Sequence, residues 1–350
     1  MGYVLSLAVG LWLFGALIGV SYAKRWFLIG MLYAAVVIAH LVLSDGASLR
    51  AATGGSVGPW LILGGIGAVV VAYRAALGQL RIKAQDRVAQ MSEATPKPTF
   101  TNVELDRYAR HIMLREIGGA GQKKLKNARV LVIGAGGLGS PVLLYLAAAG
   151  VGTIGVVDDD VVDNSNLQRQ VIHRDADIGM PKVFSAQAAM QAQNPKVVVR
   201  PYQRRLDEGN ASDLFAEYDL VLDGTDNFET RYLVNRTCVA LGKPLIAGAL
   251  TQWEGQISTY DPANGAPCYQ CIFPEAPAAG LAPSCAEAGV VGPLPGVIGA
   301  MMALEAVKEI TGAGDGMRGQ MLIYDALYSE TRKIKLKRRM DCPVCSGKSV

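Results

Sequence analysis

A glycine-rich run near the middle of the chain could bring backbone amides close to a phosphate. Its glycines are Gly134, Gly136, Gly137 and Gly139. Glycine permits a tight turn and a close approach of the backbone to a phosphate, and a helix that starts there adds amide donors. Asp158 follows the next apolar segment, where a carboxylate can accept hydrogen bonds from ribose hydroxyls. The pattern predicts a Rossmann-type nucleotide site, with a purely structural glycine turn as the alternative.

Amide and cationic side chains after this run suit a triphosphate better than a dinucleotide. Asn166 and Arg169 come soon after Asp158, and Lys182 stands at an expected helix start. An arginine can hold phosphate oxygens through paired charge-assisted hydrogen bonds, and a lysine adds a point charge. Taken singly, Lys182 could be a surface lysine and Arg169 a salt-bridge partner. Taken together, these side chains predict a site for ATP.

A further pair of polar residues, Asp226 and Asn227, follows an apolar segment that ends in Asp223. The carboxyl ends of parallel strands meet at one edge of a sheet, where carboxylates can bind Mg²⁺. Asp226 is therefore the candidate magnesium ligand, and a helix cap is its alternative role. A nicotinamide-dependent oxidoreductase would share the glycine turn but would leave Arg169, Lys182 and Asp226 unexplained.

Four of the six cysteines form two Cys-x-x-Cys pairs. The pairs are Cys268 with Cys271 and Cys342 with Cys345. Four thiolates at this spacing suit a tetrahedral Zn²⁺ with no open position, so we expect a structural zinc site, with a redox pair as the alternative. The separation of the pairs leaves open whether they meet. Cys238 lies in an apolar helical stretch and is expected in the core.

The pattern of apolar residues predicts the strands and helices that position these residues. The apolar runs Arg129–Gly134, Thr153–Val157 and Leu220–Asp223 predict buried strands, and an Ala- and Leu-rich stretch through Ala149 predicts a helix after the glycines. The expected fold is α/β, with a Rossmann-like, mostly parallel sheet and helices on both faces. The basic run 332–339 alternates with apolar residues, which favours a strand with one solvated face over a lipid- or partner-binding patch. A net charge of +4 is too small to indicate a nucleic-acid partner.

Three apolar stretches precede the soluble domain: Tyr3–Val20, Trp26–Leu43 and Val57–Leu77. Each is about long enough to cross a hydrocarbon core of roughly 30 Å as a helix. We therefore expect transmembrane helices within residues 1–80, a polar, proline-containing linker over 81–101, made of a short helix and a flexible segment, and a catalytic domain over 102–350.

The Lys and Arg residues near the apolar stretches set the expected orientation. Two lie in the first gap, one in the second, and four lie near or beyond the end of the third stretch: Lys24, Arg25, Arg50, Arg74, Arg81, Lys83 and Arg87. This bias places the N-terminus outside and the large domain in the cytoplasm of a multi-pass protein of the cytoplasmic membrane. A cleaved signal peptide is the alternative, since Ser21-Tyr22-Ala23 offers a small-x-small site, but no Lys or Arg precedes the first stretch.

The ordered motifs resemble the adenylyltransferase domain shared by ubiquitin-activating enzymes and the bacterial MoeB/ThiF/HesA group, with MoeB, the molybdopterin-synthase adenylyltransferase, the nearest likeness. The resemblance runs from about Glu104 to Cys345. Besides the glycines, Asp158 and the paired cysteines, it rests on Arg107-Tyr-Ala-Arg110, Asn166-Leu-Gln-Arg169, Pro181-Lys182, Thr225-Asp226-Asn227 and Gly255-Gln256.

The resemblance implies ATP-dependent adenylation of the C-terminal glycine carboxylate of a ubiquitin-like sulfur carrier ending in Gly-Gly. It implies that the glycines and Asp158 bind the nucleoside, and that Asn166, Arg169 and Lys182 contact the phosphates. Asp226 would organise Mg²⁺, with Asn227 beside it. Arg110 resembles an arginine that reaches across a two-fold homodimer to the partner's triphosphate; a solvated helical arginine is the alternative.

The same resemblance leaves Cys285 open, because a cysteine at this point takes part in thioester or persulfide transfer in some relatives and not in others. Cys285 stands in a proline- and glycine-rich loop. The chain has no rhodanese domain, so the sulfur donor is expected to be a separate protein. A membrane scaffold that binds a ubiquitin-like protein without chemistry, and a tRNA-carboxyl-activating relative, are the remaining alternatives. The pathway, whether molybdopterin, thiamine or another, stays open.

Overall fold

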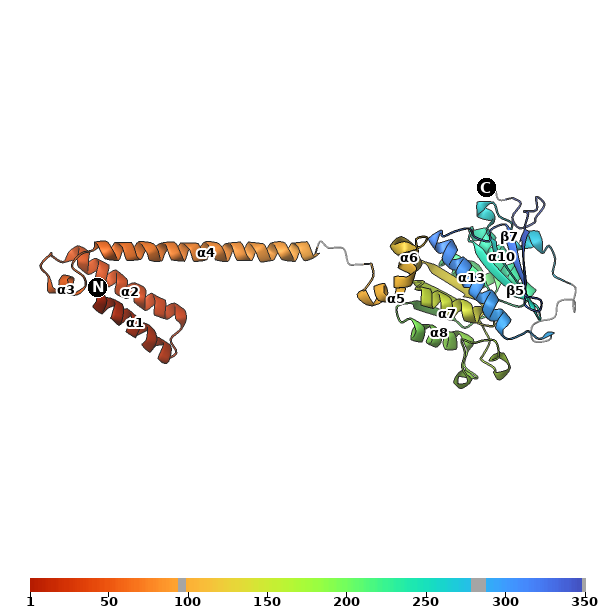
Figure 1. Ribbon diagram of the computed structural model, residues 1–350, viewed down its shortest axis with the longest axis horizontal. Coiled ribbons are helices and arrows are strands. Elements are labelled where there is room, and N and C mark those ends of the chain that lie inside the picture. The colour runs from red at the N-terminus through yellow and green to blue at the C-terminus, as the bar shows by residue number, and fades with distance from the viewer. Residues whose placement is uncertain (94–98, 278–287, 348–350) are drawn as a thin grey trace. The chain divides into compact units, whose positions relative to one another are not determined.

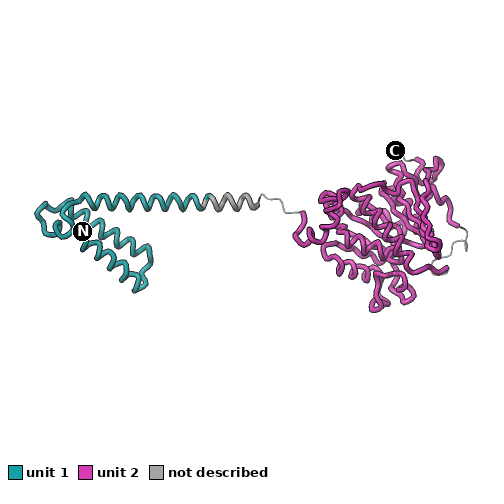
Figure 2. Tube along the Cα trace, in the orientation of Figure 1, with its two compact units in different colours: residues 1–97 teal, residues 98–350 magenta. Residues whose placement is uncertain are grey.

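The structure is a computed structural model that describes residues 1–93, 99–277 and 288–347, with the backbone alone for residue 82 and residues 84–93. The chain divides into two compact units, residues 1–97 and 98–350, which Figure 2 distinguishes by colour. Each unit is described by itself.

The first unit is helical throughout its regular structure. Its helices are α1 (Gly2–Leu17), α2 (Tyr22–Val42), α3 (Ser48–Ala52) and α4 (Gly58–Glu93). Within the described residues, two helical segments are long and apolar enough to cross a membrane, Tyr22–Val42 and Gly58–Arg81. The first predicted span forms only the 16-residue α1, which ends before Gly19, whose φ is +76°. A helix of this length is about 24 Å long.

The third predicted span begins as expected but does not end at Leu77. Helix α4 continues without a break to Glu93. No glycine or proline occurs between Gly78 and Pro96, so nothing in the local sequence interrupts helical backbone geometry there. The division at residue 80 predicted from composition therefore lies inside one helix.

The second unit is built on an eight-stranded sheet. Its strands are β1 (Arg129–Ile133), β2 (Thr153–Val157), β3 (Val198–Tyr202), β4 (Leu220–Asp223), β5 (Leu245–Leu250), β6 (Glu254–Tyr260), β7 (Gln320–Asp325) and β8 (Glu330–Lys335). The spatial order is β3-β2-β1-β4-β5-β6-β7-β8. The first five strands in this order are parallel, and β6, β7 and β8 add antiparallel pairs. The mostly parallel α/β sheet predicted from the sequence is confirmed.

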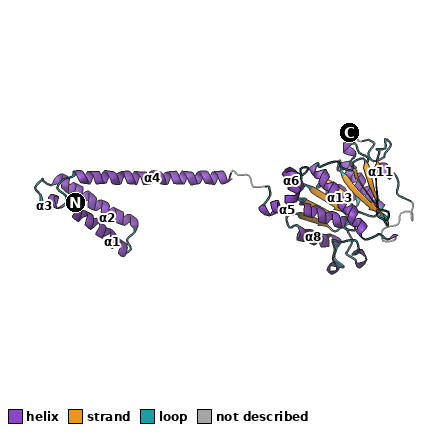
Figure 3. Cartoon of the chain, in the orientation of Figure 1, coloured by secondary structure: helices purple, strands orange, loops and turns teal. Residues whose placement is uncertain are grey.

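Helices cover both faces of the sheet, as Figures 1 and 3 show. The helices of this unit are α5 (Asn102–Ile112), α6 (Gly118–Asn127), α7 (Gly139–Ala149), α8 (Lys182–Gln193), α9 (Glu208–Ala216), α10 (Phe228–Leu241), α11 (Tyr269–Ile272) and α13 (Pro293–Thr311). Three short 3-10 turns are Asn164–Asn166, Asp175–Asp177 and Pro262–Asn264.

Alternation along the strands divides the interior into two cores. Val130 and Val132 of β1 pack with α7, α8 and α13, whereas Leu131 and Ile133 of the same strand pack with α9 and α10. Successive side chains of a strand point to opposite faces, so a parallel strand covered on both sides must be apolar at every position. The continuous apolar run at Arg129–Ile133 has this cause. Cys238 lies in the second core, as expected.

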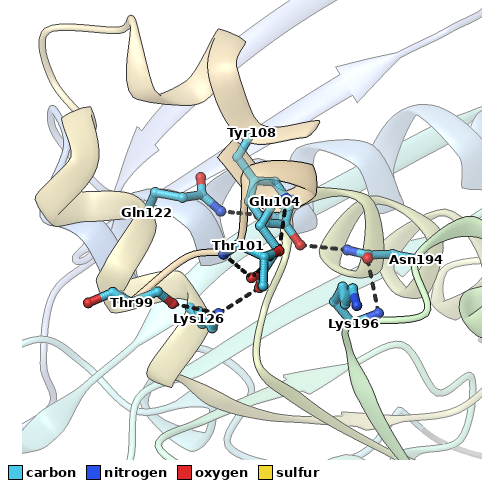
Figure 4. Close-up of polar contacts among 9 residues, drawn as sticks. Thr99, Thr101, Glu104, Tyr108, Gln122, Lys126, Asn194 and Lys196 are labelled. Atoms are coloured by element: carbon cyan, nitrogen blue, oxygen red, sulfur yellow. Dashed lines mark hydrogen bonds and ion pairs between the residues drawn. The ribbon is translucent and has the colours of Figure 1, made fainter. Parts of the chain in front are cut away.

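The chain enters the second unit through a group of ion-paired and hydrogen-bonded residues, which we call the entry clamp: Thr99, Thr101, Glu104 and Lys126 (Figure 4). Lys126 Nζ donates to the Thr99 carbonyl at 2.7 Å and to Glu104 Oε1 at 2.6 Å. Glu104 Oε2 accepts the Thr101 N–H at 2.8 Å in a capping box that begins α5. Burial alone would raise the pKa of Glu104, but bonds from Lys126 and Thr101 lower it to about 2. The clamp fixes α5 against α6.

Candidate active site and metal centre

The strand order reverses beside β1, and this reversal places the candidate site. From β1 the chain proceeds outward through β2 and β3, and then returns to β4 on the other side of β1. The carboxyl ends of β1 and β4 therefore flank a crevice, the position at which open α/β sheets bind ligands. A cleft of about 1060 Å³ lies here. Its walls include the glycine turn after β1 and the segment Gly224–Asn227 after β4.

The glycine turn is shaped by close backbone approaches. Gly134 has a φ of +94°, in the left-handed region that favours glycine. A Cβ at Gly139 would lie 2.0 Å from the Gly134 carbonyl oxygen, so no side chain fits where α7 begins. At Gly136 such a Cβ would have one neighbour within 4 Å among the described residues, Gln170 Nε2 at 3.7 Å. Gly136 and Gly137 both line the cleft, and the turn leaves their backbone open to a ligand.

Asp158 closes the other side of the turn. Its Oδ2 accepts the Ala135 N–H at 2.7 Å, and its Oδ1 accepts the Asp160 N–H at 2.9 Å. Burial raises the pKa of Asp158 above the ordinary aspartate value, against the opposing charge of Lys182. Asp158 lines the cleft next to the glycines, as its position after β2 predicted.

The predicted phosphate-binding residues lie on the same wall. Lys182 begins α8, is 5% exposed, and its Nζ lies 2.7 Å from Asp160 Oδ2. Arg169 lines the cleft and donates to the Ser165 carbonyl at 3.0 Å. Asn166 also lines it and accepts from Gln170 at 2.6 Å. Sequence reasoning did not single out Gln170, which lies 4% exposed between Asn166 and Gly136.

Asp226 and Asn227 lie on the opposite wall, after β4. Asn227 Oδ1 accepts the Thr230 N–H at 2.9 Å and caps α10. No described residue donates a hydrogen bond to the exposed Asp226 carboxylate, which faces the cleft. The capping role considered for Asp226 thus belongs to Asn227. An unengaged carboxylate in a phosphate-sized cleft fits a hard divalent cation such as Mg²⁺.

A buried arginine in the same wall was missed by the sequence analysis. Arg231 is 6% exposed, lines the cleft, and its Nη2 donates to the carbonyls of Thr225 and Gly248. It ties the segment after β4 to β5. A single arginine in a helix carries no sequence signal for this role, since both of its acceptors are backbone groups outside that helix.

One predicted residue, Arg110, is not brought to the cleft, and another, Cys285, is not described by the structure. Arg110 is exposed on α5 and is absent from the described cleft lining of its own chain. Cys285 falls outside the described residues. The nearest described residues that line the cleft on either side of this segment are Pro277 and Ala288. Gln252 donates to the Ala288 carbonyl at 2.8 Å, which holds that residue at the cleft.

The two cysteine pairs meet in one buried cluster. Sγ of Cys268 lies 3.8 Å from Cys271 and 3.6 Å from Cys342, and Cys271 Sγ lies 3.4 Å from Cys345. A tetrahedral site with Zn–S bonds of about 2.3 Å has sulfur–sulfur edges of roughly 3.8 Å. The backbone N–H of Arg339 donates to Cys271 Sγ at 3.5 Å. The donor set and its spacing fit structural zinc, which would join the segment before α11 to the C-terminal segment.

The comparisons with known proteins agree with this geometry. The ThiF family matches residues 108–344. The sulfur carrier protein adenylyltransferase of Thermus thermophilus is 50% identical over 250 residues, which cover 70% of this chain and 92% of that protein. The SAMP-activating enzyme E1 of Haloferax volcanii is 49% identical over 242 residues, covering 69% of this chain and 89% of that protein.

A solved structure shares the fold. The crystal structure of E. coli MccB with ATP superposes with a TM-score of 0.60 at 23% identity, covering 72% of this chain and 77% of that one. At this identity the likeness concerns the arrangement of strands and helices.

Proposed function

The chain belongs to the ThiF family, and from that premise we propose that it is an adenylyltransferase that activates the C-terminal glycine carboxylate of a ubiquitin-like sulfur carrier protein with ATP. The observation that carries this proposal is the cleft at the strand reversal. One cleft joins the glycine turn, Arg169, Lys182 and Asp226. The relatives named as a sulfur carrier protein adenylyltransferase and a SAMP-activating enzyme support the same substrate class.

The negative charges of the two reactants determine what the enzyme must do in this reaction. A carboxylate oxygen of the carrier attacks the α-phosphorus of ATP and forms a carbon–oxygen–phosphorus anhydride, while the bond to the β-phosphate breaks and pyrophosphate leaves. Both reactants are anions, so the main barrier is repulsion. Arg169 and Lys182 lie on one wall and offset this repulsion. A carboxylate is already ionised at pH 7, so the step needs no general base.

Asp226 is the residue that would hold Mg²⁺. The metal, when bound, neutralises phosphate charge and polarises the phosphorus centre. The chain supplies a carboxylate that the fold leaves free because Asn227, and not Asp226, caps α10. Arg231 fixes the backbone of the preceding Thr225 and so sets the direction in which this carboxylate points.

A homodimer would complete the site. Arg110 is exposed on α5 and is held away from the cleft of its own chain, while the entry clamp fixes α5 rigidly. An arginine so placed can reach a neighbouring copy's triphosphate across a two-fold axis.

The acyl-adenylate would then serve sulfur transfer in the biosynthesis of molybdopterin or a related cofactor, with sulfur supplied by a separate donor protein. Cys285 is the candidate for a covalent role in that second step. Unchanged adenylation with lost sulfur transfer in Cys285→Ala would support this role, whereas unchanged transfer would exclude it.

The first unit would anchor the enzyme to the cytoplasmic membrane. Leu61, Ile62, Val69 and Val71 of α4 are each more than half exposed, and none of the apolar window of that helix is buried. Apolar side chains exposed on every side of a helix suit a hydrocarbon surrounding. The Lys and Arg bias supports an orientation in which the catalytic domain would face the cytoplasm. Recovery of the full chain in the membrane pellet after alkaline carbonate washing tests the anchor; release into the supernatant would refute it.

Carrier-stimulated exchange of labelled pyrophosphate into ATP tests the adenylation itself. We expect exchange that requires Mg²⁺ and a carrier ending in Gly-Gly, and none with a carrier whose final glycine is removed. Stabilisation of the protein by NAD and not by Mg-ATP would instead indicate an oxidoreductase. Binding of the carrier without any exchange would indicate a scaffold.

A further inference from the structure

Both polar backbone groups of Ala135, in the glycine turn, are held by side chains. Its N–H donates to Asp158 Oδ2 at 2.7 Å, and its carbonyl oxygen accepts from His173 Nε2 at 2.9 Å. Ala135 is fully buried and His173 is 6% exposed. Asp158 lines the cleft, whereas His173 reaches the turn from behind and does not line the cleft among its described residues. The position of the turn therefore depends on a histidine that lies outside the described lining of the cleft.

The histidine continues into a chain of hydrogen bonds, which we call the relay: His173, Ser185 and Asp177. His173 Nδ1 lies 2.8 Å from Ser185 Oγ, and Ser185 Oγ lies 2.7 Å from Asp177 Oδ2. Ser185 is 1% exposed and stands in the first turn of α8, which begins at Lys182. The relay thus connects the glycine turn to the helix that carries the phosphate-binding lysine.

The relay needs one proton more than a neutral imidazole and an ionised carboxylate together provide. A carbonyl oxygen only accepts, so His173 Nε2 must carry a hydrogen toward Ala135. The Ser185 hydroxyl has one hydrogen, and either Asp177 or His173 Nδ1 can receive it, but not both. The second contact is a hydrogen bond only if the imidazole is an imidazolium or the carboxyl is protonated. With a neutral ring and an ionised carboxylate, two acceptors face each other across one contact.

We propose that His173 is a positioning residue whose relay to Ser185 and Asp177 binds one proton and thereby sets the nucleotide turn, so that ATP binding and protonation of the relay favour each other. This inference rests on the proposed function, because it concerns the turn that would receive the phosphates. A histidine is the side chain whose charge changes most readily near neutral pH.

The charged groups around the ring determine where the relay titrates. Asp177 faces it through Ser185, Lys182 approaches on α8, and Asp158 binds the opposite end of Ala135. Burial lowers the pKa of His173 below its ordinary value, and Lys182 lowers it further, while the bond to Ala135 and the charge of Asp177 raise it. The lowered pKa leaves the His173 ring largely neutral at neutral pH in the free protein. A triphosphate in the cleft adds negative charge beside the turn and Lys182, which favours the protonated relay.

The direction in which ATP affinity changes with pH follows from the linkage between ATP binding and protonation of the relay. If bound ATP raises the pKa of His173, ATP affinity must increase as the pH falls through the pKa of the ATP-bound relay, and the increase is complete below the pKa of the free relay. The test measures the dissociation constant of Mg-ATP for the full chain from about pH 5 to 8. His173→Gln keeps an N–H that can reach Ala135 but cannot titrate. We expect the affinity of the natural protein to rise about three- to tenfold more on acidification than that of His173→Gln, which is the scale of one hydrogen bond. Comparison of the two proteins cancels the titration of ATP itself.

Two aspartate variants make the experiment specific. Asp177→Asn removes the charge that favours the imidazolium and should move the transition to lower pH. Asp175→Asn removes the same charge from the same 3-10 turn without contact to the relay, and should leave the profile unchanged. Equal pH profiles for the natural protein and His173→Gln would overturn the proposal.

A second measurement does not depend on ATP. The chain has three histidines, so the ¹⁵N imidazole signals can be assigned by comparison with His173→Gln. We expect the His173 ring to titrate with loss of one ring proton, and a ring that keeps one charge state over this range would refute the relay. A titrating ring in a protein that binds no Mg-ATP would leave the relay in place and refute the proposed function.

Discussion

Asp226 and Asn227 are adjacent in the chain, yet of the two side chains only that of Asn227 forms a hydrogen bond with the described residues. Asn227 caps α10 through a 2.9 Å bond from the Thr230 N–H, whereas the Asp226 carboxylate is exposed toward the cleft and accepts no hydrogen bond from the described residues. The fold therefore separates a structural residue from a candidate metal ligand within one dipeptide.

Substitution at these two positions should have opposite consequences. Asp226→Asn is expected to leave the unfolding temperature unchanged and to raise the Mg²⁺ concentration for half-maximal pyrophosphate exchange about tenfold or more, because a neutral amide is a weaker ligand. Asn227→Ala is expected to cost about 1 kcal/mol of stability through loss of the cap. Exchange assays over a magnesium titration and thermal unfolding distinguish the two. An unchanged magnesium requirement in Asp226→Asn would remove that residue from the site.

Lys182→Met should remove the point charge nearest the phosphates. We expect carrier-dependent exchange to fall about 10²- to 10³-fold, the usual cost of losing one group that stabilises developing charge. Lys196→Met is the matched control, since Lys196 is exposed and is not part of the described cleft lining. Equal loss in both variants would show a general effect of charge and not a specific contact.

The homodimer predicts complementation between two inactive variants. Arg110→Ala and Lys182→Met should each be inactive alone, while an equal mixture should recover up to about a quarter of full activity. Half of the randomly formed dimers are mixed, and each mixed dimer has one intact site. Failure to recover activity, despite subunit exchange shown by differently tagged chains, would place Arg110 outside the site.

The cysteine cluster should bind one zinc per chain. Cys268→Ser is expected to abolish stoichiometric zinc and to lower the unfolding temperature by about 10 °C, because zinc binding contributes several kcal/mol to folding. Cys238→Ala is the control, since Cys238 is buried in a different core and should leave the metal in place. Reduced, chelator-free protein without zinc by elemental analysis would contradict the assignment.

The entry clamp should make stability depend on acid pH. The pKa of Glu104 is lowered to about 2 in the folded chain, so its contribution is complete above the ordinary glutamate value and is lost as the pH falls toward 2. Glu104→Gln should cost about 1–3 kcal/mol near neutral pH, and the difference from the natural protein should vanish at the acid end. Glu116→Gln, at an exposed pair with Arg115, should show neither effect. A constant difference across the pH range would exclude the ion pair as the cause.

Local chemistry accounts for what the sequence could predict. The strand Thr153–Val157 and the helix start at Lys182 were predicted correctly, because β-branched runs and a proline before a helix act over a few residues. The approach of the cysteine pairs, which lie 74 residues apart, depends on the whole sheet and stayed open until the structure showed it. The bonds of Arg231 to the Gly248 carbonyl, and of His173 to Ala135, likewise arise only when separate segments pack together. Asp158 could be found because its place directly after a strand marks it, whereas Arg231 and His173 stand in no such local pattern.

The hydrogen bond from Lys126 Nζ to the Thr99 carbonyl ties the chain to the second unit before α5 begins. None of the residues of the entry clamp belongs to the described cleft lining. Tension along the N-terminal chain would first load the Lys126 bond to the Thr99 carbonyl, and then the Lys126–Glu104 pair at the start of α5. The entry clamp would bear this load at the start of the second unit. The nucleotide turn could then keep its conformation while the preceding chain is pulled.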